Sequence, residues 1–433
     1  MRHSFPHVTV VLFLTLCSVA TAHAEVWNQF RGPTGSGVSG ESHLPKTWSA
    51  EKGVRWSVEL SGRANSSPAV TANRIHLTTQ LEDKSLVVMS IDRKTGKLLR
   101  QTKVGAGELA AKGSANLYAH RHNPATPSPI ADDDSIWAFF GTGLLVCLDA
   151  ETGKVQWERD LVRDYGAYDI TFGMGSTPRL WGDLLYVACM TKGESYVVAL
   201  DKLSGKEAWK ANRRLPAKDD GPDAYSTPII TQGKLGWQLL VSGSDHINAY
   251  DLTSGKQLWV SDGMAIDSPY GRVIASPVAA EGVIVATSGN PAGAGKGRMI
   301  AIRDGGSGDV STSHRLWEYG KSTPDSSTPV AYKGKLYACG DNGVASCFHL
   351  KTGELLWTKR LQKGPYHAAL VAGDDHVYAL SMEGECSVIA ADSDGDITGT
   401  NKLPGTFYAT PAISDGVIYL RGYEKLYAID GAE

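Results

Sequence analysis

The chain has 433 residues, of which 42% are hydrophobic and 21% are charged, and its formal net charge is −3. Lysine and arginine are spread along the sequence without a basic run, which argues against nucleic acid as a partner. After residue 24 no apolar stretch is long enough for a transmembrane helix, so we expect no membrane span in the mature chain.

Residues 1–24 have the features of a secretory signal peptide. Arg2 gives a positive start, Val8–Ala20 is apolar, and Ala22-His23-Ala24 fits the small-x-small cleavage rule. A membrane anchor is one alternative, but the apolar run is short for a span. A lipoprotein site at Cys17 is another, disfavoured because leucine rather than a small residue precedes it. We therefore predict a soluble product, cleaved near Ala24 and exported to the periplasm or the extracellular space.

Residues 25–52 are predicted to form an N-terminal lead segment. The stretch WNQFRGPTGSGVSG is rich in glycine and polar residues, and Trp27 and Phe30 are its expected anchors on the surface of the domain that follows. Residues 53–60, GVRWSVEL, resemble the last strand of a later repeat, KVQWERDL, but the three strands that should precede it are missing. Residues 53–433 are predicted to form one repeat domain.

One complete repeat lies in residues 128–161. It reads as four short strands separated by turn-type sequences. In the last turn, Asp149 can accept hydrogen bonds from backbone N–H groups, and Gly153 can adopt a positive φ. The first strand is predicted to begin at Ser128–Ile130, and the other three to occupy Ser135–Gly141, Leu144–Asp149 and Val155–Leu161.

Two markers of this repeat recur along the chain, about 40–60 residues apart, which is typical of four-stranded propeller blades. A Ser/Thr-Pro pair opens most units, and a D-x-x-[TS]-G-like turn precedes the last strand. The recurring aspartate is interpreted as a turn cap rather than a catalyst. The marker prolines are Pro68, Pro129, Pro178, Pro228, Pro277, Pro329 and Pro411. The turn residues are Asp92, Asp149, Asp201, Asp251, Asp304, His349 and Asp430. In a degenerate seventh unit, His367-Ala368-Ala369 replaces the marker.

The two ends of the chain complement each other. The last unit stops at Asp430 after its third strand, whereas the N-terminus has a spare strand at Val54–Leu60. Pairing the two would remove the exposed sheet edges that promote aggregation. The sequence therefore predicts an all-β, eight-bladed propeller of four-stranded antiparallel blades, with the ring closed by an N-terminal strand.

Five cysteines remain after cleavage, an odd number that leaves at least one without an intramolecular partner. Burial as small core residues is the preferred interpretation. Cys339–Cys347, within one hairpin, is the best disulfide candidate. The cysteines are Cys147, Cys189, Cys339, Cys347 and Cys386.

The segments before each Ser/Thr-Pro marker are predicted to converge on one face, around the central channel. They carry aromatic, arginine and histidine side chains that can bind a polypeptide, a sugar or a small polar ligand. Alternatively, these groups only bond to one another and fill the channel mouth. His120 and His122 are the preferred specific contacts. No catalytic residue and no metal-ligand set is predicted. The candidates are Arg63, His120, His122, Tyr225, Tyr270, Arg272, Tyr366, His367 and Tyr408.

The turn motif with its tryptophan, D-x-x-[TS]-G-K-x-x-W, resembles the PQQ-like, or quinoprotein-type, propeller repeat over essentially all of residues 25–433. The phrases WNQFRGP, FFGTGLLVCLD and GDLLYV resemble the BamB-like exported members of this family. The resemblance implies that the last-strand tryptophans dock neighbouring blades, although Arg100 takes that position in the first repeat. These tryptophans are Trp157, Trp209, Trp259, Trp317 and Trp357.

The same resemblance implies a non-catalytic scaffold in the cell envelope that binds a protein or an envelope polymer. It also implies a monomer without a cofactor. The competing expectation is a dehydrogenase that uses PQQ and calcium. It is disfavoured because the chain has no adjacent cysteine pair, which many such enzymes contain. A carbohydrate-binding propeller is the third possibility, because aromatic residues occur among the candidates.

Overall fold

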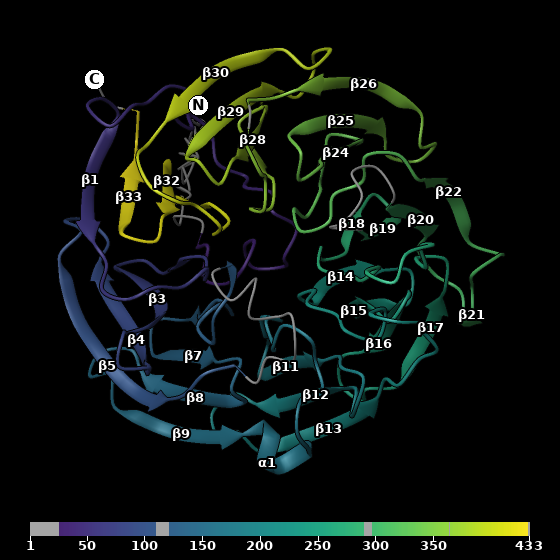
Figure 1. Ribbon diagram of the computed structural model, residues 1–433, viewed down its shortest axis with the longest axis horizontal. Helices are drawn as coiled ribbons and strands as arrows, with labels where there is room; N and C mark the ends of the chain where they lie inside the picture. The colour runs from purple at the N-terminus through teal and green to yellow at the C-terminus, as the bar shows by residue number, and fades with distance from the viewer. Residues whose placement is uncertain (1–25, 110–120, 290–296, 363, 432–433) are drawn as a thin grey trace, which may run out of the picture.

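The computed structural model describes residues 26–109, 121–289, 297–362 and 364–431. Within these ranges the chain forms 33 strands and one short helix, α1 (Leu161–Tyr165). The strands build eight sheets that stand like blades around a central axis (Figure 1). The eight-bladed propeller predicted from the sequence is therefore confirmed. The predicted signal peptide lies outside the described residues.

The first four blades follow one another along the chain, and each runs from an inner to an outer strand. Blade 1 contains β2 (Ala69–Val70), β3 (Arg74–Gln80), β4 (Ser85–Asp92) and β5 (Leu98–Ala106). Blade 2 contains β6 (Ile130–Ala131), β7 (Ser135–Phe139), β8 (Leu144–Asp149) and β9 (Val155–Asp160). Blade 3 contains β10 (Arg179–Trp181), β11 (Leu184–Cys189), β12 (Tyr196–Asp201) and β13 (Glu207–Asn212). Blade 4 contains β14 (Ile229–Gly233), β15 (Gly236–Gly243), β16 (His246–Asp251) and β17 (Gln257–Ser261).

The remaining blades complete the ring. Blade 5 contains β18 (Val278–Ala280), β19 (Val283–Ser288), β20 (Arg298–Arg303) and β22 (Arg315–Tyr319), and its β21 (Gly308–Asp309) pairs instead with β17 of blade 4. Blade 6 contains β23 (Val330–Tyr332), β24 (Lys335–Cys339), β25 (Val344–His349) and β26 (Leu355–Arg360). Blade 7 contains β27 (Val371–Gly373), β28 (His376–Leu380), β29 (Glu385–Ala390) and β30 (Ile397–Lys402). Blade 8 contains β31 (Ala412–Ser414), β32 (Val417–Arg421), β33 (Lys425–Ile429) and β1 (Val54–Glu59).

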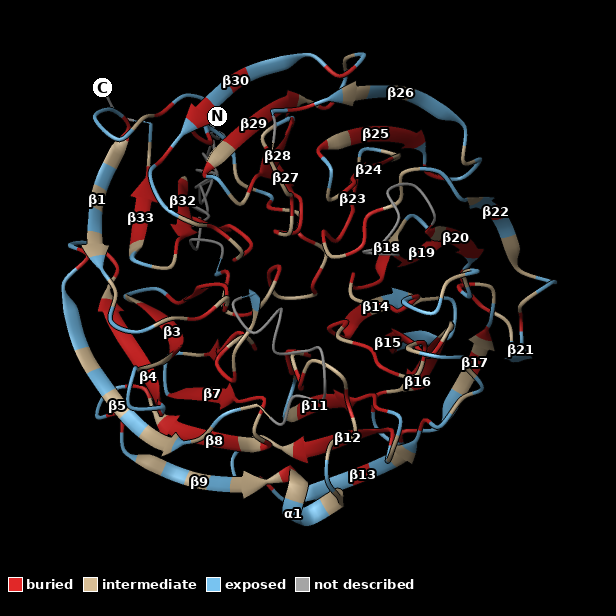
Figure 2. Ribbon diagram, viewed as in Figure 1, coloured by how far each residue is buried: buried red, intermediate tan, exposed pale blue. Residues whose placement is uncertain are grey.

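Burial changes from the axis outward. The middle strands of a blade are buried on both faces, whereas the outer strands alternate half-buried and exposed residues, as in β9 (Figure 2). This pattern follows from packing blade against blade, because only the outermost strand has solvent beside it. The core therefore lies between adjacent blades rather than at the axis.

The N-terminal strand closes the ring as predicted. β1 pairs antiparallel with β33, from Val54 opposite Ile429 to Glu59 opposite Lys425. The Leu60 N–H continues the ladder by donating to the Glu424 carbonyl oxygen at 2.7 Å. Blade 8 is thus a sheet made from both ends of the chain, and it closes the ring.

The recurring turns cap themselves with their aspartates. Side-chain oxygens of Asp92, Asp149, Asp201 and Asp251 accept the N–H three residues later at 2.6–2.8 Å, which confirms the turn-cap interpretation for these four. Asp304 is an exception, because its carboxylate accepts from the Lys234 N–H and the Gln238 amide of blade 4, each at 2.6 Å.

The last-strand tryptophans lie against the turn of the following blade. Trp157 covers Gly205, where a Cβ would lie 2.7 Å from the indole and where φ is +66°. Glycine is therefore required there both for space and for the left-handed backbone. The indole N–H of Trp157, Trp209 and Trp317 donates to a carbonyl oxygen of that turn at 2.9–3.0 Å.

Three last-strand positions depart from this arrangement. Trp259 is fully buried, donates to the Gln238 side chain at 3.3 Å and lies on a strand paired with β21. Trp357 lies over Gly395, but its indole N–H has no partner among the described residues. Arg100 reaches the turn of blade 2 and donates to the Glu151 carbonyl oxygen. Trp56 of β1, by contrast, follows the common arrangement, because its indole N–H donates to the Arg93 carbonyl oxygen in the corresponding turn of blade 1 at 3.2 Å.

The Ser/Thr of each Ser/Thr-Pro marker belongs to a hydrogen-bonded ring around the axis, which we call the hydroxyl ring. In seven of the eight steps between neighbouring blades, the backbone N–H of one marker residue donates to the hydroxyl of the next, at 2.8–3.3 Å. The ring is interrupted only at Ala369, which leaves the Thr328 N–H without a hydroxyl to reach. Its hydroxyls are those of Ser67, Ser128, Thr177, Thr227, Ser276, Thr328 and Thr410.

Completing the ring is expected to stabilise the protein. In an Ala369→Ser variant, the new hydroxyl would accept the Thr328 N–H as its equivalents do in the other blades. A net gain of about 1 kcal/mol in the free energy of unfolding follows from one added buried hydrogen bond. Thermal unfolding of the variant would show a higher midpoint, with Ala369→Val as the control that adds volume without a hydroxyl. An unchanged or lower midpoint for the serine variant would contradict this account.

The lead segment crosses the end of the channel instead of only lying on the surface. Residues 26–41, which we call the plug, bond in turn to blades on opposite sides of the ring: the Gln29 side chain accepts the Leu180 N–H of blade 3 at 2.9 Å, and Val38 pairs with Ala372 of blade 7. Trp27 is fully buried. Arg31 donates to the carbonyl oxygens of Thr328 and Pro329 of blade 6 at 3.2 and 2.8 Å. The plug therefore seals one end of the channel.

All five cysteines of residues 26–433 are buried and unbonded. This confirms their interpretation as core residues, and the proposed Cys339–Cys347 disulfide is wrong. Cys339 is opposite Ala345 in the β24–β25 ladder, so Cys347 lies one diagonal step away. Diagonal neighbours are about 7–8 Å apart, beyond disulfide reach. Separately, no helix in the described ranges is long and apolar enough to cross a membrane.

Candidate functional site

The main cavity is a funnel of about 1700 Å³ on the axis, between the plug and the opposite face. Its lining comes from the segments that join one blade to the next and from the turns between the second and third strands. The hydroxyl ring and Phe30 of the plug also line it. Because the inter-blade segments precede the Ser/Thr-Pro markers, the sequence correctly placed most of the wall.

One side of the funnel carries a four-layer stack. The His367 ring is parallel to Tyr408, with centroids 5.1 Å apart, and Tyr408 stacks on Tyr423 at 5.4 Å. The Arg63 guanidinium lies 4.5 Å over the other face of Tyr423 and donates to its hydroxyl at 3.1 Å. Both faces of Tyr408 and of Tyr423 are therefore covered. The stack presents ring edges and polar tips, not open aromatic faces, to a ligand.

A second aromatic group lies on the other side, at the junctions of blades 2 to 5. The Arg272 guanidinium sits 4.6 Å over the Phe172 ring and 3.7 Å from Asp220. Tyr225 packs against Phe172 and accepts its N–H at 3.4 Å. Tyr270 is 52% exposed, so it is the aromatic side chain of this group that is open to a ligand.

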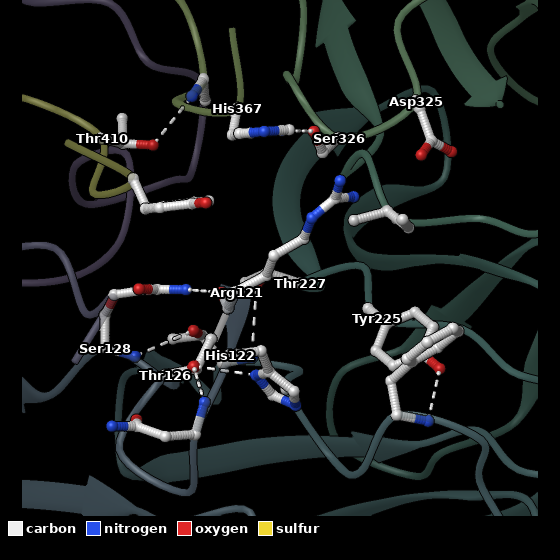
Figure 3. A pocket seen from close by; sticks show the side chains of 18 of the residues that line it. Arg121, His122, Thr126, Ser128, Tyr225, Thr227, Asp325, Ser326, His367 and Thr410 are labelled. Atoms are coloured by element: carbon white, nitrogen blue, oxygen red, sulfur yellow. Dashed lines mark hydrogen bonds between the residues drawn. The ribbon is translucent and has the colours of Figure 1, made fainter. Parts of the chain in front are cut away.

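Two carboxyl groups lie near His367 of the stack: Asp325, which is buried, and Asp341, which is partly exposed. Asp341 accepts the Ser326 hydroxyl at 2.7 Å and lies 3.3 Å from the His367 ring nitrogen, which also contacts Ser326 at 2.8 Å (Figure 3). Burial acts to raise the pKa of Asp341, but these bonds hold it below its usual value. Burial and the neighbouring Asp341 raise the pKa of Asp325 to about 7.

Replacing Asp325 should remove a pH-dependent loss of stability. A pKa raised from 3.8 to about 7 means that the carboxyl contributes stability that is fully present below about pH 3.8 and is lost as the pH rises toward 7. The free energy of unfolding of an Asp325→Asn variant, relative to that of the wild type, should therefore increase by about 3 kcal/mol from pH 5 to pH 8. Asp183→Asn, at an 86% exposed side chain, is the control. Unfolding measured at both pH values would contradict the prediction if the difference between variant and wild type were constant.

The structure gathers most of the predicted residues around the funnel. Its lining includes Arg63, His122, Tyr225, Tyr270, Arg272, His367 and Tyr408. His122 is tied to the Thr126 hydroxyl at 2.8 Å and the Gly173 carbonyl oxygen at 3.3 Å. Burial lowers the pKa of His122 to about 4, so the ring is neutral at pH 7. His120 lies outside the described residues.

Tyr366 does not belong to the funnel. Its side chain is 1% exposed and packs with Tyr337 and Leu361 in the core between blades 6 and 7. Burying a large ring there is more favourable than exposing it in the channel. In turn, the sequence analysis missed Tyr423, Phe172 and Asp341. Tyr423 and Asp341 lie in turns between the second and third strands of their blades. These turns share the funnel face, so their position in the repeat could have indicated both residues.

The funnel residues do not fit a calcium-bound quinone. Calcium requires six to eight oxygen ligands. Within the described ranges there is no group of three or more histidine, cysteine or acidic side chains that could hold a metal. The carboxylate of Asp341 is already occupied by Ser326 and His367.

Comparison with known proteins shows the family of the chain. The family model described as "Outer membrane protein assembly factor BamB" matches residues 46–180, 141–385 and 341–433. The assembly factor BamB of Yersinia pestis is 23% identical over 331 residues, which cover 73% of this chain and 74% of that protein.

Solved structures share the fold. BamB from Moraxella catarrhalis has a TM-score of 0.61 at 15% identity and covers 87% of this chain and 96% of its own. A europium-containing methanol dehydrogenase has a TM-score of 0.63 at 12% identity, with 93% and 90% covered. An assembly factor and an enzyme are thus about equally similar in backbone, so this likeness establishes the architecture and not the activity.

Proposed function

We propose that this chain, which belongs to the family of the outer membrane protein assembly factor BamB, is a non-catalytic binding scaffold in the cell envelope. In this proposal the chain is exported, works as a monomer without a cofactor, and holds a segment of a partner protein in the funnel. The observation that carries it is a large cavity, sealed by the plug at one end and lined by arginine, tyrosine and histidine side chains.

The stack favours a polypeptide over a sugar. Sugars are commonly held against open aromatic faces, but both faces of Tyr408 are covered by His367 and Tyr423. What remains available are donors and acceptors at the ring edges, together with the exposed ring of Tyr270. Such groups suit the amides and side chains of an extended segment.

A photo-crosslinking amino acid placed at Tyr270 tests this role. In intact cells it should form a defined adduct with an envelope protein. The matched control is Leu203, which is 68% exposed and lies in an outer turn of blade 3 that does not line the funnel. Adding Arg63→Ala and Tyr408→Ala should weaken the adduct at position 270. Equal adducts at both positions, or no effect of the two substitutions, would argue against the funnel as the binding site.

The cofactor-free part of the proposal needs a separate measurement. The purified chain is titrated with PQQ and calcium while absorbance and tryptophan fluorescence are followed. We expect no saturable binding up to high micromolar cofactor. Stoichiometric binding would instead support a quinoprotein dehydrogenase.

A further inference from the structure

The hydroxyl ring has unused hydrogen-bond donors at the base of the funnel. Each hydroxyl accepts a backbone N–H, and none of the seven donates to a protein group among the described residues. All seven line the funnel and are at most 4% exposed. A serine or threonine hydroxyl has one O–H to donate, so a ligand acceptor at the base could receive several such bonds.

One arc of this ring lies over two buried arginines. Arg179 donates to the carbonyl oxygen of Pro228, which follows Thr227 of the ring, at 3.1 Å. Arg31 donates to the carbonyl oxygen of Thr328, the ring member two steps further, at 3.2 Å. Ser276 lies between these two members in the ring. The arc of Thr227, Ser276 and Thr328 thus has a guanidinium group bonded to its backbone at each end.

Neither arginine is neutralised by an acid. Each is at most 1% exposed and donates to carbonyl oxygens, and neither has a carboxylate within 4 Å among the described residues. Burial lowers the pKa of Arg31 and of Arg179 to about 9, so both remain charged at neutral pH. Buried positive charge without a counter-ion is unfavourable, and an anion close by would relieve it.

We propose that the arc formed by Thr227, Ser276 and Thr328 is an oxyanion-binding site, which takes a carboxylate, sulfate or phosphate group. The hydroxyls would donate directly to its oxygens, while Arg31 and Arg179 would supply the positive field from behind. These residues lie beneath the rim, so the inference holds whether or not the rim binds a polypeptide. The group could be a free anion or the carboxylate of a longer ligand that enters through the funnel.

Calorimetric titration of the whole chain with sodium acetate and sodium sulfate, against sodium chloride at equal ionic strength, tests the site. Saturable binding of the oxyanions is expected to weaken about tenfold in Ser276→Ala, which removes the middle donor. Ser128→Ala is the matched control, because it removes an equivalent ring hydroxyl away from both arginines. Ser276→Cys, which keeps the volume but donates weakly, replaces the alanine variant if that one does not fold.

The source of the group is separated by a second pair of probes. A short peptide with a free C-terminal carboxylate is compared with the same peptide as its amide. Preference for the free acid would identify a ligand-borne carboxylate, whereas binding of inorganic anions alone would identify a free-anion site; both support the oxyanion chemistry. The proposal is overturned if acetate and sulfate bind no better than chloride, or if Ser128→Ala weakens binding as much as Ser276→Ala.

Discussion

A chain that starts at residue 61 should not form a stable ring. It lacks β1, which provides the outer strand of blade 8 and pairs with β33 over five residue pairs. Its loss would expose the N–H and C=O groups of the β33 edge and remove the Trp56 contact with blade 1. We expect aggregation, or a broad and strongly lowered unfolding transition, in size-exclusion chromatography and calorimetry.

Addition of the missing part in trans provides the control. A peptide of residues 26–60 should restore a monomeric species and a sharp transition if the defect is the missing strand and plug. The same peptide with Val58→Pro should fail, because Val58 lies opposite Leu426, one hydrogen-bonded pair away from Leu60 and Glu424, and proline cannot donate there. A soluble truncated chain with an unchanged transition would show that the ring does not depend on this closure.

The repeat made the fold predictable from the sequence. In blade 2 the strands predicted at Leu144–Asp149 and Val155–Leu161 match β8 (Leu144–Asp149) and β9 (Val155–Asp160) almost residue for residue. Turn chemistry is local, since the aspartate and the amide it caps are three residues apart. Ring closure was also predictable, because the last unit lacks one strand and the N-terminus has a spare strand that can pair with it.

What the sequence could not reveal are contacts between distant segments. Arg31 and Thr328 are 297 residues apart, and nothing local indicates that they bond. The same holds for the stack, which brings Arg63 next to Tyr423. The Ser/Thr-Pro marker was recognised as a pattern, but its physical role in the hydroxyl ring required the neighbouring blades. Tyr366 was misplaced for the complementary reason, because a tyrosine beside a marker can point into either the core or the channel.

The plug gives the funnel its shape and therefore its chemistry. A propeller channel is open at both ends unless another segment covers one of them. Here the carbonyl oxygens of Phe30 and Gly32 are held by Arg179, and those of Gly35 and Ser36 by Arg31. The arginines that fasten the plug are also those beneath the arc of hydroxyls. Attachment of the plug and the proposed oxyanion site therefore depend on the same two side chains.

An Arg31→Met variant should lose about 3 kcal/mol of stability and loosen the plug. Methionine can fill the space, but it leaves the carbonyl oxygens of Gly35, Ser36 and Pro329 without their donor, whereas that of Thr328 keeps the Leu370 N–H. Removal of the buried charge offsets part of this cost, so the effect is smaller than that of three unpaired groups. Arg55→Ala is the matched control, since its ion pair with Asp430 at 2.8 Å involves a side chain that is 43% exposed. That pair should contribute less than about 1 kcal/mol.

Hydrogen exchange distinguishes a loosened plug from general destabilisation. The Ser39 N–H and the Ala372 N–H bond across the junction between plug and blade 7, each at 2.8 Å. In Arg31→Met both should exchange faster, while amides of the β7–β8 ladder in blade 2 keep their protection. In Arg55→Ala neither group should change. Uniform acceleration over all blades, or full protection at Ser39 and Ala372, would show that Arg31 does not hold the plug in place.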